Sequence, residues 1–155
     1  MIKETLKKLQ GTFHFELRDK EGNLKDTWEV KNLVTNAGFA QLALLAGDAS
    51  ATPFTYLAVG TSATAPAVTD TTLNAEITDS GLERASGTVS RVTTTVTNDT
   101  YQITYTWTVS GSKTIEEVGV FNDASAGTML SHALTTSKAV TSGETLTGLY
   151  KLQIS

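Results

Sequence analysis

The sequence has no cysteine, only two prolines, and a charged fraction of just 18%. Without cysteine the chain can form no disulfide, no cysteine-ligated zinc site and no thiol nucleophile. No apolar run approaches the roughly 20 residues of a membrane-spanning helix, and the first residues lack the apolar stretch of a secretory signal. We therefore expect a protein made in a cytoplasm, or assembled there into something larger, without a membrane partner.

Threonine is abundant where charge is scarce: the 155 residues include 28 threonines. Its branched β-carbon suits the pleated surface of a strand, so the composition favours a sheet protein. The length is typical of one domain and sufficient to bury a core.

The net charge is −4, so we expect no general attraction to nucleic acid. Charge is concentrated at the start, because residues 1–31 hold seven of the 12 basic residues and six of the 16 acids. This densely charged segment differs from the more neutral, threonine-rich remainder, and a solvated hairpin is its simplest interpretation.

Alternation of apolar and polar residues predicts about eight strands. We expect them over residues 12–18, 24–34, 54–59, 85–97, 101–109, 114–121, 128–134 and 146–154. Turn residues separate most of them, as in the loop Asp19–Asn23. The pattern predicts a mainly β fold: a two-sheet antiparallel sandwich of jelly-roll type, with an arm at residues 1–10 and one domain at 11–155.

One short helix is expected after the second strand. Thr35 or Asn36 would cap it, Gly47 would follow its end, and Phe39, Leu42 and Leu45 would pack on the sheets. Residues 60–83 show no convincing strand or long helix. Connections of this length are uncommon in compact domains and often contact partners.

The sequence offers little support for catalysis, metal binding or a cofactor. His14 and His132 lie in predicted strands without an evident carboxylate partner, so both are interpreted as structural. His132 has the same strand parity as Leu130 and Leu134. The Ser110–Lys113 segment has the serine–lysine spacing of penicillin-recognising enzymes, but it falls in a turn rather than at the start of a helix. We expect no enzyme, no metal and no cofactor.

Several segments together resemble virion structural proteins of tailed bacteriophages. The resemblance rests on Asn32–Gly38, Tyr56–Thr61, Ala65–Pro66, Asp70–Leu73, Ile115–Phe121 and Met129–Leu130. It covers most of the chain from about Gly11 onward. Similar proteins are small head-decoration (cement) proteins or components of the tail and baseplate.

The resemblance implies a non-enzymatic virion protein assembled in the host bacterial cytoplasm. The first expectation is a homo-oligomeric capsid decoration protein, whose partners are the major capsid protein and other copies of itself. A tail or baseplate subunit contacting other tail proteins is the alternative, and a carbohydrate- or receptor-binding module is a third.

Partner contacts are expected where the sequence shows no role in folding. These are the N-terminal arm and the stretch from Ser62 to Leu73. The residues chosen are Ile2, Leu6 and Leu9 in the arm, and Ala65, Pro66, Asp70 and Leu73 in the connection. Exposed strand edges are a further means of pairing between subunits.

Overall fold

The structure, a computed structural model, describes residues 9–154 and contains ten strands and one helix in that part of the chain. In chain order they are β1 (Gln10–Arg18), β2 (Leu24–Lys31), β3 (Leu33–Val34), α1 (Asn36–Gly47), β4 (Tyr56–Gly60), β5 (Ala85–Ser86), β6 (Thr88–Val92), β7 (Thr100–Thr108), β8 (Lys113–Phe121), β9 (Met129–Val140) and β10 (Thr145–Gln153).

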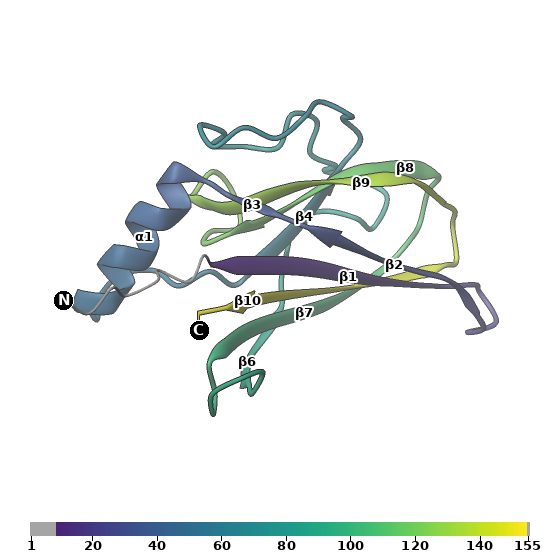
Figure 1. The fold of residues 1–155 in the computed structure, drawn as a ribbon. Helices are drawn as coiled ribbons and strands as arrows, with labels where there is room; N and C mark the ends of the chain where they lie inside the picture. The colour runs from purple at the N-terminus through teal and green to yellow at the C-terminus, as the bar shows by residue number, and fades with distance from the viewer. Residues whose placement is uncertain (1–8, 155) are drawn as a thin grey trace.

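The strands form two antiparallel sheets of five, so the predicted two-sheet sandwich is confirmed (Figure 1). Sheet A has the order β2-β1-β10-β7-β6, and sheet B has the order β3-β9-β8-β4-β5. In-sheet hairpins join β1 to β2, β6 to β7 and β8 to β9, while the chain crosses between sheets after β2, β5, β7 and β9. The jelly-roll type expected from the sequence stays a prediction.

Two segments predicted as single strands are each divided between the sheets. Residues 24–34 split at Asn32 into β2 of sheet A and β3 of sheet B. Residues 85–97 split at Gly87, where a Cβ would lie only 2.6 Å from Ile103 Cγ1 and 2.7 Å from the Thr104 carbonyl oxygen. The close approach at Gly87 explains why a residue without a side chain stands at the crossing.

The core between the sheets is aromatic on the side of sheet A. Phe13 and Tyr150 lie on neighbouring strands with their ring centroids 4.7 Å apart, and both are fully buried. The predicted alternation in β7 is confirmed at Ile103 and Trp107, which are buried in the same cluster. Trp107 also donates a hydrogen bond from Nε1 to the Glu83 carbonyl oxygen at 2.8 Å.

Helix α1 begins as predicted, and two of its three expected packing residues contact the core. Thr35 is its N-cap and accepts a hydrogen bond from the Gly38 amide at 2.9 Å. Gly38 lies against the backbone of Leu130, where a Cβ would be 2.8 Å from the Leu130 Cα. Because residues four and seven positions later share a helix face, Leu42 and Leu45 pack on the core.

The expectation that Phe39 packs on the sheets is wrong, since its side chain is 48% exposed. Phe39 directly follows Gly38 and is therefore rotated about 100° away from the packed face. The helix also includes Gly47, which was expected just beyond its end, and Asp48 is the C-cap.

The expected arm overlaps the sheet at its last residue, because β1 begins at Gln10. Leu9 packs against the core cluster. Ile2 and Leu6 lie outside the described residues. The long connection contains no named strand in the described chain, as expected, and crosses the outer face of sheet B, above β8 and β9 in Figure 1.

Candidate functional site

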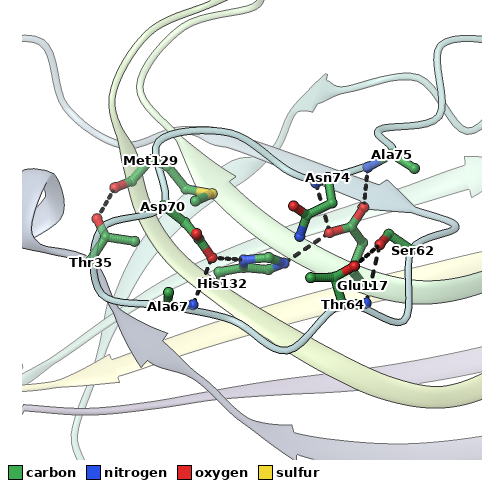
Figure 2. Close-up of polar contacts among 10 residues, drawn as sticks. All are labelled: Thr35, Ser62, Thr64, Ala67, Asp70, Asn74, Ala75, Glu117, Met129 and His132. Carbon is green, nitrogen blue, oxygen red and sulfur yellow. Dashed lines mark hydrogen bonds and ion pairs between the residues drawn. The ribbon is translucent and has the colours of Figure 1, made fainter.

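The outer face of sheet B holds a buried cluster of one histidine and two carboxylates (Figure 2). His132 lies in β9, and its side chain has no exposure to solvent. Its Nδ1 is 2.8 Å from Asp70 Oδ2, and its Nε2 is 2.9 Å from Glu117 Oε2. Both ring nitrogens are therefore used, one toward the long connection and one toward strand β8.

Glu117 joins the cluster to the backbone of the connection. Its side chain is fully buried, and it accepts hydrogen bonds from the Ala75 amide at 2.6 Å and the Asn74 amide at 3.0 Å. Gly60 makes room for this contact, because a Cβ there would clash with Glu117 Oε1 and lie 2.7 Å from the Ala75 carbonyl oxygen. The carboxylate thus provides the hydrogen-bond acceptor for two successive backbone amides of the connection.

Asp70 holds the middle of the connection. Its Oδ2 accepts a hydrogen bond from the Ala67 amide at 2.8 Å and also meets His132. Three residues later, Leu73 is 5% exposed and packs with Ala58, Phe121 and Met129 in a second small apolar cluster. Polar and apolar contacts therefore fix the same stretch of chain.

The hydrogen bonds set the charge state of the cluster. Burial alone would lower the pKa of His132, but its hydrogen bonds to Glu117 and Asp70 outweigh burial and raise the pKa above its ordinary value of 6.5. Burial would raise the pKa of Glu117, whereas hydrogen bonds from His132 and the Ala75 and Asn74 amides lower it overall. The hydrogen bond from the Ala67 amide is the main reason that the pKa of Asp70 is lowered. All three shifts favour an imidazolium between two carboxylates.

A second set of contacts fixes the end of the connection. Arg84 forms a two-pronged ion pair with Glu76, at 2.8 Å from Nε and 2.6 Å from Nη2. Its guanidinium lies 3.6 Å from the centre of the Phe121 ring and donates to the carbonyl oxygens of Asp123 and Ala126. The connection from Thr61 to Arg84 is therefore fastened at several points rather than lying free on the surface.

The structure gives folding roles to two residues expected only to contact a partner. Asp70 and Leu73 fasten the connection, so the expectation that Ser62–Leu73 has no role in the fold is wrong for them. Ala65 is exposed and Pro66 half-buried, and both remain predicted partner contacts. Neither takes part in the cluster.

Sequence reasoning missed the cluster because two irregularities change strand parity. The pairing of β8 with β9 shifts between Ile115 and Glu117, which places Ile115 in the inner core and Glu117 on the outer face. A second shift between Val120 and Phe121 puts Leu130 in the inner core, while His132 faces outward. Strict alternation would therefore place His132 on the same face as Leu130, which belongs to the inner core. The sequence signal that could have revealed the cluster was the presence of a glutamate and a histidine within two neighbouring apolar strands.

Neither a metal site nor a membrane-spanning helix is found among residues 9–154. Within residues 9–154, no set of three or more histidine, aspartate or glutamate side chains is arranged to hold a metal ion. His14, the other histidine, lies on the polar face of β1 and pairs with Glu29 at 2.8 Å. No helix in the described part of the chain is long and apolar enough to cross a membrane.

Sequence comparison places the chain among the virion structural proteins of tailed bacteriophages. A family model described as podophage GP4 fiber I protein gp80 matches residues 35–151, and the chain belongs to this family. The match spans the cluster, the long connection, four strands of sheet B and three of sheet A, and leaves out β1, β2 and β3. Searches of curated proteins and of solved structures found no match.

Proposed function

We propose that the chain is a non-enzymatic structural subunit of a phage fibre. The observation that carries this proposal is the family match, whose description names a podophage fibre protein. The matched residues include Asp70, Glu117 and His132, which fasten the long connection. The proposal therefore applies to the sandwich together with its long connection.

The chemistry of the cluster supports a structural role. A general base needs access to a substrate proton, but His132 is fully buried and both of its ring nitrogens are occupied by carboxylates. The cluster instead holds a surface connection rigidly over sheet B. A rigid surface suits a protein that acts by fitting against neighbouring subunits.

The family description favours a fibre subunit over the head-decoration role that was the first expectation from the sequence. The proposed partners become other copies of the chain and tail proteins. A receptor-binding tip would be expected to expose several aromatic side chains. Phe39 is 48% exposed, but Trp107 and Tyr150 are buried, and Tyr101 and Tyr105 pack on the core.

Immunogold electron microscopy of intact virions tests the proposed position. An antibody raised against the purified protein is expected to label the fibres at the tail. Uniform label over the capsid would reject the fibre proposal and favour head decoration. Virions of a mutant lacking the gene provide the control, because they should carry no label at either position.

A further inference from the structure

An apolar groove opens at the end of the sandwich that carries helix α1. Its volume is about 370 Å³. Leu42 and Leu45 of the helix form one wall, Val89 of β6 forms another, and Leu152 and Ile154 lie at the end of β10. Val89 and Ile154 are 44% and 63% exposed, so the groove presents large apolar side chains to water.

The described chain begins beside this groove. Gln10, the first residue of β1, pairs with Gln153, which lies between the groove residues Leu152 and Ile154. Leu9 already packs against the core. The preceding eight residues therefore join the domain at the edge of this apolar groove.

The sequence of these residues suits the groove. Ile2, Leu6 and Leu9 have the i, i+4, i+7 spacing of one helix face, and Lys3, Lys7 and Lys8 fall outside that stripe. Eight residues reach about 12 Å as a helix and more than 25 Å when extended, which is enough to enter a groove that begins beside Leu9.

We propose that the groove is the binding site of the chain's own N-terminal segment, with Ile2 and Leu6 as the inserted side chains. The tether at Leu9 favours the segment of the same chain over that of a second copy, because a short linker gives an effective concentration in the millimolar range. Bound in this way, the segment covers Leu42, Leu45 and Val89 and leaves its lysines in water. The proposal is independent of the fibre assignment.

A disulfide between introduced cysteines tests the proposal directly, because the natural chain contains no cysteine. In the double variant L6C/L45C, mild oxidation is expected to produce a disulfide within one chain, seen as a faster-migrating monomer on a non-reducing gel. The control L6C/L24C places the second cysteine at the exposed Leu24, at the start of β2 in the hairpin distant from the groove, and should give no such band. A disulfide between two chains of L6C/L45C would overturn the proposal in favour of segment exchange between copies.

A deletion of residues 1–8 provides a second test that does not depend on cysteine geometry. The deletion leaves β1 intact, since that strand begins at Gln10. The shortened protein is expected to bind the apolar dye ANS several-fold more strongly than the full chain, because the groove is uncovered. Equal dye binding by the two proteins, or no disulfide within one chain of L6C/L45C, would overturn the proposal.

Discussion

His132 Nε2 lies 2.9 Å from Glu117 Oε2, and neither side chain is exposed to solvent. This contact joins β9 to β8, and through Glu117 it reaches the amides of Asn74 and Ala75. A pair of buried ionisable side chains thus holds a long surface connection against a sheet. The stability of the connection should depend on the protonation of the pair and on the space around it.

Replacing His132 by leucine should be strongly destabilising. The substitution leaves Glu117 buried without its positive partner, and breaking a buried ion pair in this way costs about 3–5 kcal/mol. Urea denaturation should show this decrease in the free energy of unfolding. The control His14→Gln removes a pair whose side chains are about half exposed, so it should change stability by less than about 1 kcal/mol. Equal effects of the two substitutions would contradict the role of the cluster.

Stability should decrease on both sides of a pH window set by the cluster. The raised pKa of His132 contributes stability that is fully present below its ordinary value of 6.5 and is lost as pH rises through the folded-state pKa. The lowered pKa values of Glu117 and Asp70 contribute stability above their ordinary values of 4.5 and 3.8, which is lost as pH falls through the folded-state values. The free energy of unfolding, measured by urea denaturation across this range, should therefore be highest between these limits.

His132 alone should account for the loss of stability on the alkaline side of the pH window. In His132→Gln the side chain does not titrate, so the loss of stability above the pKa of His132 should be much smaller than in the natural protein. An unchanged alkaline loss in the variant would show that another group is responsible.

Gly60→Ala should destabilise the protein by about 1–3 kcal/mol through overpacking. The added methyl group would clash with Glu117 Oε1 and the Ala75 carbonyl oxygen. Gly47→Ala is a matched control, because a Cβ there meets nothing within 4 Å. The midpoint temperature of thermal unfolding should be well below that of the natural protein for Gly60→Ala and close to it for Gly47→Ala. A neutral Gly60→Ala would mean that the connection can move away from sheet B at little cost.

Arg84→Lys should cost about 1–3 kcal/mol despite keeping the charge, because lysine cannot reproduce the two-pronged contact with Glu76. It also loses the planar stacking on Phe121. Arg91→Lys is the control: Arg91 is exposed in the edge strand β6, and its replacement should be nearly neutral in urea denaturation. A neutral Arg84→Lys would show that charge alone fixes this end of the connection.

The sequence allowed prediction of the sandwich but not of the way its surface connection is fixed. Local alternation predicts strands such as β7 and β10 because one face of each packs on a common core. The splits at Asn32 and Gly87 are harder to predict, since they depend on where the other sheet lies. The cluster unites residues from three distant segments, and two irregular pairings bring its glutamate and histidine to one face. The cluster forms through tertiary contacts, and the periodicity of a sequence does not predict such contacts.

Hydrogen exchange at the amides of Asn74 and Ala75 tests most directly whether the cluster fastens the connection. In Glu117→Gln a single carboxamide oxygen replaces the two oxygens that accept these amides. Exchange of at least one of the two amides should therefore become about tenfold faster or more, while the amides of β10 keep their natural rates. The control Glu116→Gln changes the neighbouring glutamate, which bonds to Ser137 instead, and should leave both amides unaffected. Unchanged exchange of Asn74 and Ala75 in Glu117→Gln would contradict the account.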